Sequence, residues 1–165
     1  VATPMHRSVL DAVEMVEKGY SAAEVKKILE ETREKMTIYI GLSTLEYLKK
    51  GGRISKTVAI AGSLLSIKPV VSVVDGEVAL LGKARGSRQG NNFLIQQIQK
   101  DGIDFSRPFF LGYTGLSDAL LQKYISDSAE IWKEHVDHLP IGTIGGAIGT
   151  HVGPGAIAVA FFTEK

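Results

Sequence analysis

The segment Gly142-Thr-Ile-Gly-Gly-Ala-Ile-Gly-Thr-His-Val-Gly-Pro-Gly155 places a histidine, His151, between a glycine-spaced apolar segment and a Gly-Pro-Gly turn. Its glycines leave one side of the expected helix without side chains, so another backbone or a long apolar ligand can lie against that side. They are Gly142, Gly145, Gly146 and Gly149. His151 follows where this helix meets the turn, just before the strand-like run 156–162. A polar group beside an apolar channel would suit a lipid carboxylate.

Length and composition restrict the class of protein. The 165 residues suit a single domain over 1–165, and 44% apolar with 22% charged residues is typical of a soluble globular protein. A net charge of +1 argues against a general nucleic-acid surface. The absence of cysteine excludes disulfides, thiolate catalysis and Cys-ligated zinc.

The apolar windows do not predict a membrane span. Lys68 and Pro69 interrupt the first of them, 58–74, and the second, 141–152, is too short to cross a bilayer. No signal peptide opens the chain, so we expect a cytoplasmic protein. The missing initiator Met indicates a piece of a longer polypeptide.

Expected helices and strands alternate along the chain. Asp75-Gly76 is the strongest hairpin signal, and Ser21-Ala-Ala-Glu24 is a capping box that opens a helix. We expect helices over 5–18, 56–64, 87–100, 117–132 and the glycine-rich segment, and strands over 37–42, 66–74, 77–81, 109–113, 135–139 and 156–163. A further helix opens at Ser21 and includes Val25, Ile28 and Leu29, and a short one begins at Ser43 or Thr44 and ends at Gly51-Gly52. The pattern predicts an α/β fold in which a mixed β-sheet is packed with helices.

Several motifs have ordinary interpretations. His135 and His138 are spaced as H-x-x-H, but on a strand positions i and i+3 point to opposite faces, so we expect surface histidines and no metal site. The glycine segment matches neither of two nucleotide-binding patterns, G-x-G-x-x-G and G-x-x-x-x-G-K-[ST]. Ser117 suits a helix cap better than a nucleophile.

The basic segment Lys83-Ala-Arg-Gly-Ser-Arg88 opens an expected helix. Positive charge near a helix N-terminus is electrostatically disfavoured. Arg85 and Arg88 therefore either bind an anion or acidic partner outside the domain or form a solvated face.

Four motifs follow one another along the chain: Leu45-Glu-Tyr-Leu-Lys-Lys-Gly-Gly-Arg-Ile54, Ile67-Lys-Pro-Val70, Gly82-Lys-Ala-Arg85 and Ile148-Gly-Thr-His-Val-Gly-Pro-Gly-Ala156. In this order and spacing they resemble the C-terminal domain of the DegV family of bacterial fatty-acid-binding proteins. The resemblance covers essentially the whole chain, and the family's N-terminal α/β domain is absent, along with the hydroxyls that it contributes to the carboxylate site.

The resemblance implies a non-enzymatic carrier whose ligand is a long-chain fatty acid such as palmitate, with no cofactor. In the family the acyl chain lies between the domains and its carboxylate meets the histidine of H-x-G-P-G, which is His151 here. The expected fatty-acid site comprises His151, Thr150, Gly149, Gly153, Ile54, Ile148 and Val152. The expected partner is a fatty acid kinase, which makes the acyl phosphate, and Arg85 with Arg88 resembles its docking surface.

The apolar residues of this site, Ile54, Ile148 and Val152, are equally compatible with ordinary core packing. Rival hypotheses are a small-anion enzyme with His151 as general base and a structural or protein-interaction domain. The enzyme would need an acid to orient the imidazole, and the sequence indicates none.

Overall fold

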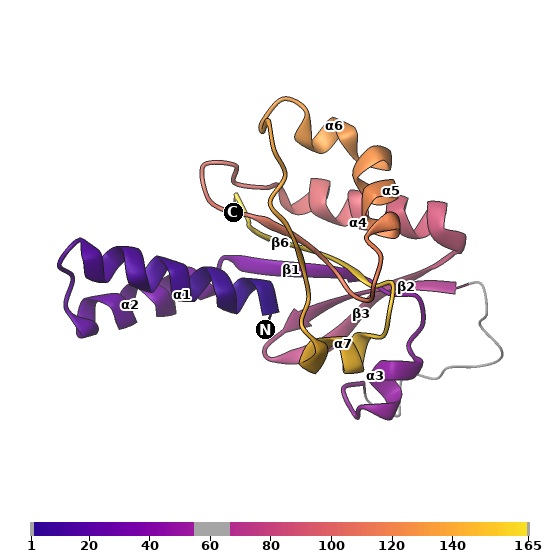
Figure 1. Cartoon of the computed structure of the whole chain (residues 1–165), viewed down its shortest axis with the longest axis horizontal. Helices are drawn as coiled ribbons and strands as arrows, with labels where there is room; N and C mark the ends of the chain where they lie inside the picture. Colours follow the sequence, from indigo (N-terminus) through magenta and orange to yellow (C-terminus); the bar gives the residue numbers. More distant parts are fainter. Residues whose placement is uncertain (1, 55–66, 165) are drawn as a thin grey trace.

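The computed structural model describes residues 2–54 and 67–164, and its centre is a six-stranded sheet of order β3-β2-β1-β6-β4-β5 (Figure 1). β4 and β5 are parallel, and the other neighbouring strands are antiparallel. The strands are β1 (Met36–Gly41), β2 (Ile67–Val74), β3 (Glu77–Arg85), β4 (Phe110–Tyr113), β5 (Ile141–Thr143) and β6 (Ile157–Phe162). The expected α/β fold with a mixed sheet is confirmed.

Helices lie on both sides of this sheet. They are α1 (Ala2–Glu17), α2 (Ala22–Arg33), α3 (Glu46–Lys50), α4 (Gly86–Asp101), α5 (Ala119–Asp127), α6 (Ala129–Trp132) and α7 (Gly146–Val152). Figure 1 shows α4, α5 and α6 on one side, α3 and α7 on the other, and the α1–α2 hairpin extending away from the sheet. The two sides therefore offer separate surfaces for ligands.

The main core fills the space between the sheet and helices α4 and α5. Leu94 and Ile98 of α4 and Leu121 of α5 pack there against Val159 and Phe161 of β6. Every residue of β6 is buried, so this central strand has apolar contacts on both faces. Ile38, Ala158 and Ala160 form a smaller cluster on the opposite face.

The local turn and cap signals have the expected structures. Asp75 and Gly76 have φ angles of 50° and 81°, and they connect β2 to β3 in the predicted hairpin. The Ser21 backbone N–H donates to Glu24 Oε2 at 2.8 Å, and the capping box starts α2. Each signal acts over four residues or fewer, so distant parts of the chain are not needed to form it.

The apolar face of α1 is not buried against the sheet. The helix forms as the sequence predicts, but Val9, Val13 and Val16 are 57%, 48% and 62% exposed, and Leu10 is 41% exposed. Its contacts with α2 leave this face uncovered by the described residues.

The expected strand over 135–139 is wrong, because these residues form turns and bends. The strand follows Pro140 instead, as β5, and pairs with β4. The prediction that Gly142 belongs to the glycine-rich helix is also wrong, because Gly142 lies in β5. A β-carbon at this position would be only 2.5 Å from the Phe110 ring. The sheet partner, which local sequence does not reveal, selects the segment that pairs.

The expected helix 117–132 is interrupted at Ser128, which separates α5 from α6. The Ser128 hydroxyl donates to the Tyr124 carbonyl at 2.7 Å and accepts from Trp132 Nε1 at 2.8 Å. These bonds hold the buried Trp132 side chain against the end of α5. The expected helix 56–64 lies outside the described residues.

Candidate ligand-binding site at the contact of helices α3 and α7

His151 lies in the last turn of α7, a seven-residue helix that ends at Gly153. Gly153 has a φ of 77°, a conformation that favours glycine, and its backbone N–H donates to the Gly149 carbonyl at 2.8 Å. The C-terminal glycine therefore ends α7 just after the histidine, and His151 is held near the end of a helix as expected.

The His151 ring packs against the end of α3. A β-carbon on Gly51 would overlap His151 Nδ1, so only glycine leaves room for the imidazole at this position. In the same contact the Tyr47 ring covers Gly153, where a β-carbon would overlap the ring. The Y-L-K-K-G-G-R-I and H-x-G-P-G segments are thus brought together by α3 and α7.

The His151 side chain is partly buried and is not fully satisfied. Nδ1 is buried and has no hydrogen-bond partner among residues 2–54 and 67–164. A buried N–H without an acceptor is costly, which favours the tautomer with the proton on Nε2. That tautomer makes Nε2 the hydrogen-bond donor of the ring.

The glycine face of α7 is open. A β-carbon at Gly145, Gly146 or Gly149 would meet no atom of the described residues within 4 Å. Thr150 is exposed, and its hydroxyl donates to the Ala147 carbonyl at 3.0 Å. Gly145 at the N-cap and Gly146 and Gly149 within α7 therefore leave bare backbone on the side that the sequence predicts to be free.

The three expected wall residues lie in or against one apolar cluster under α3 and α7. Ile54 and Val152 are 9% and 5% exposed, and Ile148 is partly exposed at the edge of the cluster. Ile148 therefore has the surface that a ligand could touch. Ile54 and Val152 hold the two helices together in the described part of the chain.

Arg85 and Arg88 are both exposed at the junction of β3 and α4. Neither forms an ion pair within 4 Å with a carboxylate of the described residues. Their guanidinium groups therefore remain available to an acidic surface. His135 and His138 are exposed too, and the described residues contain no group of three potential metal ligands.

The sequence predicts that Gly51 and Gly52 end a short helix, which the structure confirms for Gly51 in α3, but it indicates neither the contact of Gly51 with His151 nor any role for Tyr47. Their roles depend on the contact between α3 and α7, which are about a hundred residues apart in the chain. The only signal was the paired glycines after α3, which also end that helix. No helix in the described ranges 2–54 and 67–164 is long and apolar enough to cross a membrane.

Comparisons with known proteins agree with this architecture. A family model described as an uncharacterised protein of the DegV family matches residues 1–164. A DegV domain-containing protein of Clostridium perfringens is 36% identical over 158 residues, which cover 93% of this chain and 52% of that protein. The chain thus spans about half the length of the curated relatives that it matches.

Solved structures share the fold. A protein described as a fatty acid binding DegV family protein from Streptococcus agalactiae superposes with a TM-score of 0.80 at 26% identity, covering 98% of this chain and 56% of that chain. The Fatty Acid Kinase (Fak) B3 protein of Streptococcus pneumoniae, loaded with linoleic acid, has a TM-score of 0.82 at 20% identity. The match covers 98% of this chain and 56% of that chain. With a family match over nearly its whole length and the same fold, this chain belongs to the DegV family.

Proposed function

We propose that this chain forms one side of a binding site for a long-chain fatty acid, with His151 at the carboxylate and the bare face of α7 along the acyl chain. The observation that carries the proposal is the position of His151 at the end of a helix whose Gly145, Gly146 and Gly149 are uncovered. The protein acts as a carrier and not as a catalyst.

Elementary energetics support this arrangement. Burying an acyl chain contributes roughly 0.8 kcal/mol per methylene, so an apolar surface supplies most of the affinity. The described chain provides such a surface near α7, because Ile40, Val78, Leu80 and Ile148 are only partly buried. The carboxylate needs a hydrogen-bond donor, and Nε2–H of His151 supplies one.

The descriptions of similar solved proteins also support the proposal. The Streptococcus agalactiae protein described above carries fatty acid binding in its description. The same binding is named for a DegV family protein of Thermus thermophilus, at 25% identity and a TM-score of 0.78. This chain spans 56% and 57% of the length of these two proteins.

The geometry disfavours the rival in which His151 acts as a general base. Such a base is normally oriented by an acid that hydrogen bonds its second nitrogen. Nδ1 of His151 packs over Gly51 and meets no carboxylate of the described residues. The imidazole therefore has the surroundings of a ligand-binding donor.

Native mass spectrometry tests the proposal on the natural polypeptide that contains residues 1–165, before and after mild organic extraction. We expect a co-purified mass of fatty-acid size that extraction removes and that added palmitate restores. A polypeptide that never carries this mass, and does not take up palmitate, would show that the proposal is wrong.

Gly149→Ala separates ligand binding from folding. The new methyl group meets open space in the protein, and alanine is favoured over glycine in a helix by up to about 1 kcal/mol, so we expect stability to be unchanged or slightly higher. The same methyl group would occupy space beside the acyl chain, so palmitate affinity should fall several-fold. Calorimetric titration and thermal melting measure the two effects, and unchanged affinity would remove the face of α7 from the site.

We further propose that Arg85 and Arg88 dock a fatty acid kinase, which phosphorylates the presented carboxylate. Arg85→Glu should leave palmitate binding intact and lower the rate of acyl-phosphate formation at least tenfold, because it reverses a charge at an exposed contact. Lys27→Glu, at an exposed position on α2, is the matched control. Equal losses in both variants would argue against a specific docking surface.

A further inference from the structure

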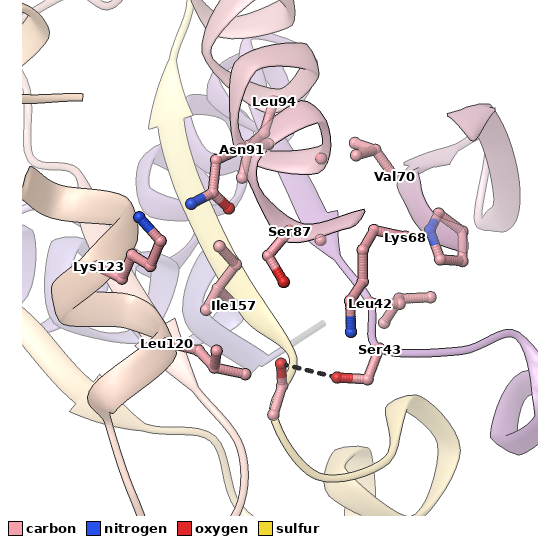
Figure 2. A pocket seen from close by; sticks show the side chains of 14 residues that line it. Leu42, Ser43, Lys68, Val70, Ser87, Asn91, Leu94, Leu120, Lys123 and Ile157 are labelled. Atoms are coloured by element: carbon pink, nitrogen blue, oxygen red, sulfur yellow. Dashed lines mark hydrogen bonds between the residues drawn. The ribbon is translucent and has the colours of Figure 1, made fainter. Parts of the chain in front are cut away.

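A small pocket on the other side of the sheet from α7 contains a lysine that the fatty-acid proposal does not use. It lies between α4 and α5, where β1 ends and β2 and β6 begin (Figure 2). Its floor is apolar and includes Leu94 and Ile157 of the main core. Lys68, Ser43 and Ser87 bring polar groups to the same space.

Lys68 is the central group of this pocket. It belongs to the Ile67-Lys-Pro-Val70 motif, and its stem is partly buried against α4. A β-carbon on Gly90 would lie 2.9 Å from Lys68 Cβ, so the glycine allows strand β2 and helix α4 to approach closely here. No carboxylate of the described residues lies within 4 Å of the Lys68 ammonium.

The second lysine of the pocket is already neutralised. Lys123 Nζ contacts both Asp127 carboxylate oxygens, at 3.1 and 3.2 Å, and Asn91 Nδ2 donates to the same carboxylate at 2.7 Å. The Asn91 hydrogen bond, with help from Lys123, lowers the pKa of Asp127. Since this pair balances its own charge, Lys68 leaves the pocket with a net positive charge.

Hydroxyl groups complete the polar side. Figure 2 shows the Ser87 hydroxyl and the Lys68 ammonium directed into the pocket, with Ser43 beside them. The Ser43 hydroxyl donates to the Gly155 carbonyl at 3.4 Å, and this long bond is easily exchanged for a stronger acceptor. At the start of α4 the backbone N–H of Arg85 donates to Gln89 Oε1 at 3.1 Å, and the Arg85 side chain itself does not cap the helix.

We infer that this pocket binds a small oxyanion, the phosphate or carboxylate group of a compact ligand, through Lys68 and Ser87. The cavity of about 40 Å³ accommodates a group of a few heavy atoms and is too small for an acyl chain. An ammonium and a hydroxyl that converge without an acidic partner match the charge and hydrogen-bonding needs of such a group. The site is separate from His151 and does not depend on the proposed fatty-acid binding.

The test is a titration of the ¹⁵N-labelled natural polypeptide with inorganic phosphate and, separately, with acetate at constant ionic strength. We expect saturable shifts of the Ser87, Gly90 and Asn91 amide signals with at least one anion, and the tighter of the two identifies the preferred group. Lys68→Met should weaken this binding roughly tenfold, as expected for the loss of a charge-assisted contact.

Matched variants make the result specific. Lys83→Met removes the same charge from an exposed position on neighbouring β3 and should leave the affinity unchanged. Ser87→Ala removes an exposed hydroxyl and provides a second variant if Lys68→Met does not fold; it should weaken binding about threefold. Shifts that never saturate with either anion, or equal losses in the Lys68 and Lys83 variants, would overturn the inference.

Discussion

His151→Ala will lower the affinity of the natural polypeptide for palmitate by roughly ten- to a hundredfold. The variant removes the donor proposed to meet the carboxylate, and a hydrogen bond to a charged group contributes about 1.5–3 kcal/mol. Isothermal titration calorimetry with palmitate measures the change. The free energy of unfolding should change by about 1 kcal/mol or less, because the ring is only partly buried and its Nδ1 has no partner among the described residues.

His135→Ala is the matched control for this experiment. His135 is exposed and stacks on Phe105 at a ring-centroid distance of 4.0 Å, away from α7. Its loss should leave palmitate affinity unchanged. Wild-type affinity in the His151 variant, or an equal loss in both histidine variants, would remove His151 from the binding site.

Phe161→Ala will destabilise the fold more than any other substitution considered for this protein. Phe161 is 1% exposed in the middle of the main core, and its ring lies 5.8 Å from that of Tyr39. Truncating a buried phenylalanine costs about 3–5 kcal/mol through lost transfer energy and the cavity left behind. We expect the thermal midpoint to fall by roughly 10 °C. Urea denaturation followed by circular dichroism measures the free energy directly.

Leu116→Ala provides the reference for that measurement. Leu116 is fully exposed in the loop after β4, so its truncation should change stability by no more than about 0.5 kcal/mol. A Phe161 variant that unfolds at the same urea concentration as the Leu116 variant would contradict the assignment of β6 to the centre of the core.

Where the sequence predicted an element correctly, the signal was local. Asp75-Gly76 specifies a hairpin because its backbone needs positive φ angles at both positions. The Ser21–Glu24 capping box closes on itself within one helical turn. The continuous apolar run of β6 likewise predicted a strand, since a central strand is buried on both faces.

Where the prediction was wrong, the deciding partner was far away. Residues 135–139 have a strand-like composition, but β4 pairs with β5 after Pro140, where Gly142 accommodates the Phe110 ring. The predicted helix 117–132 is divided into α5 and α6, because the Ser128 hydroxyl hydrogen bonds both the Tyr124 carbonyl and the Trp132 indole. Local propensity contains no information about either contact.

The sequence by itself determined the α/β class and the family, because hydrophobic periodicity, turn residues and motif order are local properties of the chain. It also singles out His151 as a candidate ligand-binding residue, which stays a prediction. Only the tertiary structure decided that the His151 ring packs against Gly51 and that the Tyr47 ring packs against Gly153. It also placed Lys68 with Ser87 in a pocket on the other side of the sheet. These contacts join residues far apart in the chain, and only the packing of helices on a folded sheet fixes which of them meet.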